Sequence, residues 1–245
     1  MIDFHCHILP AIDDGAASWV ESLEMARFCA ADGIRQVFAT PHCHKYIHNL
    51  RAEIVPLVAE LNARIAAAGI PVEILSGSEI QVIDASDYKR EFESGVFCHF
   101  DGGCEFTLLE FNWAREQFPA DAVELVAWLR SRGMIPILAH PERYNYFDRE
   151  PGLLRGLVAA GAWVQVTVDS MLGNHGPDPK VAAERILREY PEAVLSTDAH
   201  NLMRCSGLAA GYAWVRDHLG AERRDDLLAR AESALKRIRA PFKFV

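Results

Sequence analysis

Seven short apolar segments alternate with longer amphipathic segments along this chain of 245 residues, and this alternation limits its fold more than any other feature. The apolar segments span residues 2–6, 36–40, 72–75, 106–111, 135–139, 163–167 and 194–197. Short, almost uniformly apolar runs are typical of strands that are covered on both faces. Strands that alternate with helices favour one parallel sheet, either open and doubly wound or closed into a barrel.

Helical patterns occupy the segments between the predicted strands. Leucine and isoleucine recur at spacings of three and four from Leu50 to Ile65, which gives one apolar stripe. Ser18 is a good N-cap for a helix that runs to about residue 31. Further helices are predicted around residues 122–129, 153–160, 179–190, 208–218 and 224–239. Residues 84–103 are the least regular part and are interpreted as an insertion or a lid. Because no linker divides the chain, we predict a single domain over residues 1–245.

The composition excludes several classes of partner. A formal net charge of −9 argues against nucleic acid, because phosphate backbones need a basic surface. The six cysteines form no C-x-x-C pair, which favours reduced thiols. The sequence has no apolar run of membrane-spanning length and no signal-peptide pattern at its start. We therefore expect a cytoplasmic protein without membrane insertion; its oligomeric state stays open.

Residues that can bind metal ions follow six of the seven predicted strands. They are His5, His7, His42, Glu79, Glu110, His140, Asp198 and His200. In a parallel barrel the carboxyl ends of the strands share one rim, so these side chains would converge there. His5 and His7 are two residues apart on a strand and therefore face the same way, which places Phe4 and Cys6 towards the covering helices.

The ligand types indicate which ions and substrates such a site would take. Imidazole and carboxylate groups suit Mn²⁺, Fe²⁺, Zn²⁺ or Mg²⁺, and the number of ligands implies two or three ions. Asp14 adds another carboxylate, although an aspartate before Gly15 is also typical of a turn. Arg143 and Arg204 lie close after two of the histidines and would add positive charge. With two or three divalent cations and these two arginines, the site would favour a dianion such as a phosphate monoester.

The sequences of these motifs resemble those of a known family. The segments "DFHCHILPAIDDGA", "ATPHCH", "GSEI", "LLEF", "AHPERY", "STDAH" and "QVTVDSMLGNHG" are similar to those of the polymerase-and-histidinol-phosphatase (PHP) superfamily. Within it they resemble the capsule-type bacterial protein-tyrosine phosphatases, from residue 1 to about residue 211. The resemblance implies a distorted seven-stranded (β/α) barrel, a TIM-like PHP fold, with a metal site at the C-terminal ends of its strands.

The resemblance also implies a role for each site residue. Three divalent ions are expected, most often manganese, with iron, zinc or magnesium as alternatives. The first ion would be held by His5, His7, Glu79 and Asp198, the second by Glu79, Glu110 and His140, and the third by Asp14, His42 and His200. Arg143 and Arg204 would bind the phosphate, and His42 is counted with them as catalytic. A metal-bound hydroxide would attack phosphorus, without a cysteinyl intermediate.

The implied substrate is a phosphotyrosine protein, namely the tyrosine-rich tail of a bacterial tyrosine kinase that controls capsule and exopolysaccharide synthesis. Two alternatives stay open: a small-molecule phosphatase such as a histidinol-phosphate phosphatase, and a metal-binding scaffold without catalysis. Cys43 stands where a second histidine is expected, with His44 one residue on, and residues 89–103 match the family least.

Two other features allow competing interpretations. Cys29 and Arg35 fit the C-x₅-R spacing of cysteine-dependent phosphatases, but the cysteine falls late in a predicted helix, which argues against that mechanism. Tyr144, Tyr146 and Phe147 could form the wall of a substrate pocket or pack in the core.

Overall fold

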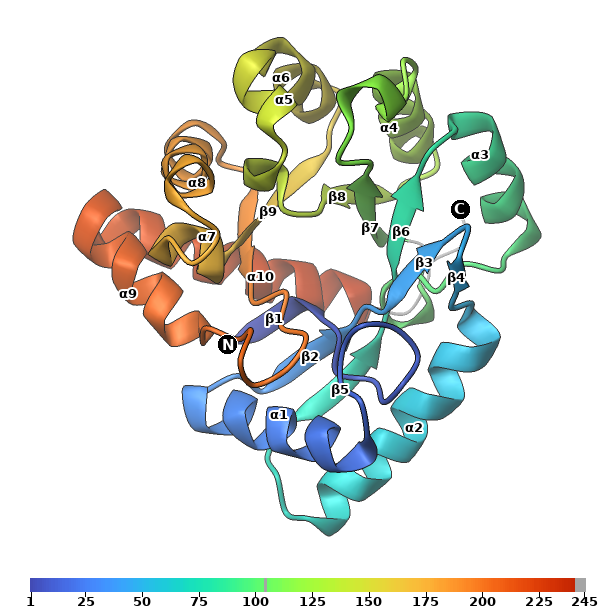
Figure 1. Ribbon diagram of the computed structural model, residues 1–245, viewed down its shortest axis with the longest axis vertical. Coiled ribbons are helices and arrows are strands. Elements are labelled where there is room, and N and C mark those ends of the chain that lie inside the picture. Colours follow the sequence, from blue (N-terminus) through green and yellow to red (C-terminus); the bar gives the residue numbers. More distant parts are fainter. Residues whose placement is uncertain (104, 241–245) are drawn as a thin grey trace.

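The computed structural model describes residues 1–103 and 105–240, in which ten strands form a ring with helices around it (Figure 1). The strands are β1 (Ile2–Cys6), β2 (Gln36–Ala39), β3 (His42–His44), β4 (Ile47–His48), β5 (Glu73–Ser76), β6 (Glu79–Val82), β7 (Phe106–Phe111), β8 (Ile135–Leu138), β9 (Trp163–Thr167) and β10 (Ala193–Ser196). Each of the seven predicted strands is present within one residue of its predicted bounds.

The ring closes, so the open-sheet alternative is wrong. One sheet has the order β1-β2-β5 and the other has the order β10-β9-β8-β7-β6-β3-β4. The register of β2 on β5 continues without change into that of β3 on β6, since Gln36 pairs with Glu73 and His42 with Glu79. At the other side Cys6 bridges to Ala199, next to a 2.8 Å bond from the Asp198 amide to the His5 carbonyl. β2 with β3 and β5 with β6 each act as one barrel strand, and β4 is an antiparallel edge strand. The result is a distorted (β/α)₇ barrel.

The helices lie outside the ring in Figure 1, except that α10 passes behind the strands. They are α1 (Trp19–Asp32), α2 (Arg51–Ala67), α3 (Ala85–Ser94), α4 (Ala122–Ser131), α5 (Asn145–Arg149), α6 (Pro151–Ala159), α7 (Val168–Leu172), α8 (Pro177–Glu189), α9 (Leu208–Leu219) and α10 (Ala221–Ile238). Short 3₁₀ turns cover Phe100–Gly102, Arg115–Gln117 and Pro141–Arg143. Ser18 caps α1 as predicted, by accepting a hydrogen bond from the Glu21 amide. Within the described part of the chain, none of these helices combines the length and apolarity that a membrane crossing requires.

The interpretation of residues 84–103 as an irregular insertion is wrong for half of that segment. It contains α3, which connects β6 to β7 as an ordinary crossover of the barrel. Asp84 caps this helix through its side chain, and Gly95 ends it in the left-handed conformation. Only Ala85 and Tyr88 of the helix are buried, so the sequence lacks the broad apolar stripe that would have revealed it.

Contrary to the prediction, the side chain of Phe4 does not share the helix-facing side of β1 with Cys6. Its ring stacks on Phe38 at 5.3 Å, in an apolar cluster that joins residues of six strands with Ala231, Ala234 and Ile238 of α10. The register of β1 on β2 contains an extra residue between Asp3 and Cys6, which breaks the simple alternation of faces. Cys6 behaves as predicted and packs in the cluster shared with the helices.

Candidate metal centre

The carboxyl ends of the strands surround a polar cavity of about 310 Å³. Its lining is drawn from the loops or strand ends after six strands. The lining residues are Asp14, His42, Glu79, Glu110, Trp113, His140, Arg143, Asp198, His200 and Arg204. The chain therefore gathers distant residues at the rim that the strand order defines.

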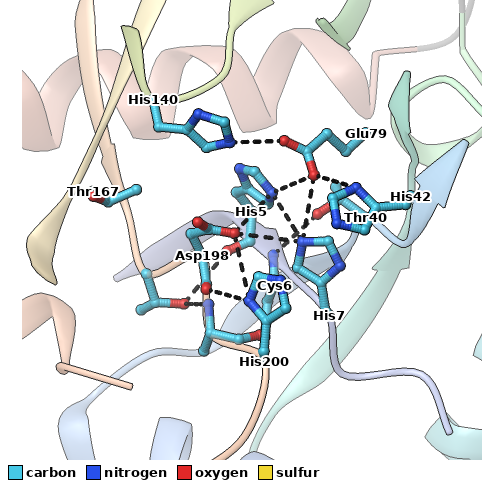
Figure 2. Close-up of polar contacts among 12 residues, drawn as sticks. His5, Cys6, His7, Thr40, His42, Glu79, His140, Thr167, Asp198 and His200 are labelled. Atoms are coloured by element: carbon cyan, nitrogen blue, oxygen red, sulfur yellow. Dashed lines mark hydrogen bonds and ion pairs between the residues drawn. The ribbon is translucent and has the colours of Figure 1, made fainter. Parts of the chain in front are cut away.

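Glu79, the first residue of β6, contacts four histidines of this cluster (Figure 2). Its Oε2 is 2.9 Å from His42 Nδ1, 3.3 Å from His5 Nε2 and 3.5 Å from His7 Nε2. Its Oε1 is 2.9 Å from His140 Nε2. A carboxylate that faces four imidazoles from a fully buried position has the geometry of a group shared between cations.

Asp198 faces the same pair of histidines from the opposite side. Its Oδ1 is 3.2 Å from His5 Nε2 and 3.4 Å from His7 Nε2, and its Oδ2 accepts a 2.8 Å bond from Arg143. Asp198 and His140 have φ angles of +53° and +34°, an unfavourable conformation for residues other than glycine. Such strain is found where the surrounding fold imposes a side-chain direction, as at functional sites.

A third group lies at the mouth of the cavity. Asp14 Oδ1 is 3.4 Å from His42 Nε2 and 3.4 Å from His200 Nε2, and its side chain is 57 % exposed. The rings of His7 and His200 stack at 4.0 Å. Arg204 lies at the rim, where its Nη1 is 3.9 Å from Asp14 Oδ2.

Glu110 at the end of β7 completes the cluster. Gln81 donates a 3.2 Å hydrogen bond to its Oε2. Burial and the charge of Glu79 raise the pKa of Glu110 to about 8. A buried acid of this kind keeps its proton at neutral pH unless a cation replaces the proton.

The donor set fits divalent cations. Four overlapping groups bring their ligand atoms within 4.8 Å of one another: His7, Asp14, His42 and His200; His5, Glu79 and His140; His5, His7 and Asp198; and His42, Glu79 and Glu110. Glu79 Oε2 and His42 Nδ1 are buried without a hydrogen-bond partner among the described residues, although they lie 2.9 Å apart. Buried polar atoms without a hydrogen-bond partner are expected where cations bind.

The electrostatics of the cluster also favour cations. Burial alone would lower the pKa of His42, but Glu79 and Asp14 outweigh it and raise that pKa to about 10. His7 behaves alike, because Asp13, Asp198 and Glu79 raise its pKa well above the usual range against the effect of burial. The carboxylates thus attract positive charge strongly enough to hold protons that metal ions would displace.

The structure brings all nine predicted ligands to this one site, together with Arg143, and places Arg204 at its rim. Tyr144, Tyr146 and Phe147 are buried and pack against one another, so they do not line the cavity. Cys29 is buried within α1, and the Arg35 guanidinium is bonded to the carbonyls of Ala30 and Ile34. The C-x₅-R spacing therefore forms no phosphate-binding loop.

Three residues of the site were missed by the sequence analysis. Asp13 Oδ2 lies 2.8 Å from His7 Nδ1 and also accepts a hydrogen bond from the His42 amide. Gln165 Oε1 lies 3.1 Å from His5 Nδ1 and accepts from the His140 amide. Trp113 follows β7 and lines the cavity. A glutamine inside the apolar strand "WVQVT" is a signal that could have revealed Gln165.

The chain is similar to known proteins over most of its length. The family model described as "Capsular polysaccharide synthesis, CpsB/CapC" matches residues 1–236. The chain is 35 % identical over 206 residues to tyrosine-protein phosphatase YwqE of Bacillus subtilis, covering 82 % of this chain and 78 % of that one. It is 27 % identical over 205 residues to the putative tyrosine-protein phosphatase CapC of Staphylococcus aureus, with the same coverage.

The fold has a close match among solved structures. A chain from the crystal structures of YwqE from Bacillus subtilis and CpsB from Streptococcus pneumoniae, described as metal-dependent tyrosine phosphatases, superposes with a TM-score of 0.90 and 32 % identity. The match covers 100 % of this chain and 97 % of the other. A histidinol phosphate phosphatase of Lactococcus lactis matches with a TM-score of 0.56 and 13 % identity, which shows a shared fold.

Proposed function

The chain belongs to the CpsB/CapC family of capsular polysaccharide synthesis, and on that premise we propose that it is a metal-dependent protein-tyrosine phosphatase. The observation that supports this most strongly is the contact of Arg143 with Asp198 at 2.8 Å beside the carboxylate–imidazole cluster. A phosphate bound by this arginine would lie next to the groups that hold the cations. Such an arrangement suits hydrolysis of a phosphate monoester.

The proposed ligand sets divide among three ions the nine side chains whose ligand atoms lie close together in the site. His5, His7, Glu79 and Asp198 would hold one ion, Glu79, Glu110 and His140 a second, and Asp14, His42 and His200 a third. Divalent ions, of which we propose manganese, supply Lewis-acid activation of the phosphoryl group and lower the pKa of water. The donor set of nitrogen and oxygen atoms is compatible with manganese, iron, zinc or magnesium.

The two arginines would bind and orient the phosphate group. Arg143 uses one nitrogen for Asp198 and keeps the rest of its planar fork for an anion. Its side chain is 19 % exposed, whereas that of Arg204 is 47 % exposed. Arg143 is therefore preorganised, and Arg204 can adjust to the substrate that enters.

The finer assignments belong to the same proposal. The substrate would be a phosphotyrosine protein, and we propose the tyrosine-rich tail of a bacterial tyrosine kinase of polysaccharide synthesis. Residues 1–245 would act as one catalytic domain. Free thiols at Cys6, Cys29, Cys43, Cys98 and Cys205 are consistent with the reducing cytoplasm.

Release of phosphate from a phosphotyrosine peptide with Mn²⁺ present tests the function. We expect turnover that ends on chelation with EDTA and returns with added metal. His42→Ala should lower the rate by at least about 100-fold, whereas His48→Ala, which changes an exposed histidine of β4, should not. Equal rates for the wild type and His42→Ala would contradict the proposed mechanism.

The same assay separates the alternatives. Histidinol phosphate as a competing substrate should be hydrolysed much more slowly than the phosphotyrosine peptide. Preference for histidinol phosphate would favour the small-molecule phosphatase. Metal binding without turnover of either substrate would favour the scaffold.

A further inference from the structure

Trp113 is the only apolar side chain among the described residues that line the cavity. It follows β7 directly after Asn112 and is 48 % exposed. An indole ring that is half exposed and lines a charged cavity is accessible to a molecule that enters the cavity.

The local structure holds Trp113 in one orientation. The Asn112 side chain accepts a 2.9 Å hydrogen bond from the Ala114 amide, which forms a tight turn around Trp113. The indole lies parallel to the His140 ring, with an angle of 7° and 5.6 Å between centroids. Tyr144 packs against it at 4.7 Å, and this tyrosine is itself buried.

Trp113 also contacts the arginine that faces the cavity. The guanidinium carbon of Arg143 lies 4.9 Å from the centre of the indole, within the range of a cation–π interaction. The same guanidinium donates to Asp198. The phosphate-binding group and the indole therefore form a continuous surface from the cation site to solvent.

A phosphate ester placed on this surface would bring its alcohol portion next to the indole. An aromatic alcohol can pack against it and gain both apolar contact and ring–ring interaction, whereas a small alkyl group gains little. The remaining lining residues are charged or polar, and the histidines among them belong to the groups that can bind cations.

We propose that Trp113 determines specificity for phosphate monoesters of aromatic alcohols by packing against the ring of the bound ester. This inference rests on the proposed function and assigns to the same site a residue that determines its specificity. It assigns a binding role to Trp113 and none in the chemical step.

Two phosphonates that cannot be hydrolysed test the assignment. Phenylphosphonate and methylphosphonate carry the same anion and differ in the group that would reach Trp113. The measured quantity is inhibition of phosphotyrosine-peptide hydrolysis by the manganese-loaded protein. Trp113→Ala should weaken inhibition by phenylphosphonate about fivefold and leave inhibition by methylphosphonate unchanged. Trp113→Phe should retain most of the affinity, because it keeps an aromatic face. Trp19→Ala, which alters a partly buried tryptophan on α1, is the matched control.

Other outcomes would overturn the assignment. An equal loss for both phosphonates in Trp113→Ala would mean that the indole only supports His140 and Arg143. No change for either would mean that the ester does not contact it. Failure of the proposed function is distinguishable, because the wild type would then not release phosphate from any phosphotyrosine peptide, whatever the variants do.

Discussion

Asp13 Oδ2 lies 2.8 Å from His7 Nδ1, so the opposite nitrogen of His7 is the one that faces Asp198 and Glu79. The same oxygen accepts a 3.0 Å bond from the His42 amide. Gly15 makes this turn achievable, since a Cβ there would lie 2.2 Å from the His7 carbonyl oxygen. Asp13 thus orients two candidate ligands without lining the cavity itself.

Asp13→Asn should lower manganese affinity by about 10- to 100-fold, because partners that orient a ligating histidine contribute that much. Calorimetric titration of metal-free protein measures this. Asp84→Asn, which changes a capping aspartate on α3, should bind manganese like the wild type. Unchanged affinity in Asp13→Asn would show that His7 needs no such support.

The two arginines should differ in their importance. Arg143→Ala should lower kcat/KM for a phosphotyrosine peptide by about 100-fold, and Arg204→Ala by about tenfold, because Arg143 is the more buried and better oriented donor. Steady-state kinetics at saturating metal provide the comparison, with the exposed Arg155→Ala as control. A larger loss for Arg204→Ala would reverse the assignment.

Cys29→Ala should keep kcat/KM within about twofold of the wild type. The thiol is buried in α1, and burial raises its pKa well above the usual range, so no thiolate nucleophile forms. Phosphatase kinetics together with a melting curve separate activity from stability. Loss of turnover in a variant that remains folded would restore the cysteine mechanism.

Metal affinity should rise with pH. Glu110, whose pKa burial and Glu79 raise to about 8, and His42, whose pKa is raised to about 10, must both lose protons to bind a cation. Affinity should therefore increase through neutral pH and beyond pH 8. Calorimetry in buffers of different ionisation enthalpy counts the protons released, and Glu110→Gln should release fewer. Equal release by both proteins would contradict the assignment.

His99 should make the protein less stable in acid. Burial and the charge of Arg51 lower its pKa from 6.5 to about 4. Between these pH values the unfolded chain binds a proton that the folded chain does not, so stability falls as pH decreases from about 6.5 to about 4. The loss is on the order of 3 kcal/mol at full extent.

Urea denaturation at about pH 7.5 and about pH 5 measures this effect. His99→Asn keeps a partner for Thr107 and cannot titrate, so it should lose less stability between the two pH values than the wild type. An identical loss in both proteins would assign the acid sensitivity to other groups.

Strand positions and the candidate ligands could be predicted from the sequence, because short apolar runs and polar residues at their ends are local patterns. Ser18 and the stripe in α2 followed from local rules in the same way. Helix α3 could not be predicted in this way, because it is largely exposed and buries few side chains, so its sequence has little apolar pattern.

Register and side-chain partners depend on contacts between distant segments, which no local pattern encodes. Because β1 contains an extra residue relative to β2, the side chain of Phe4 points into the cluster that contains Phe38. The sequence by itself determined that histidines and acids would meet at one rim, since parallel strands impose a common direction. Only the tertiary structure decided that Asp13 orients His7 and that Trp113 stands beside Arg143, because packing across the ring selects those neighbours.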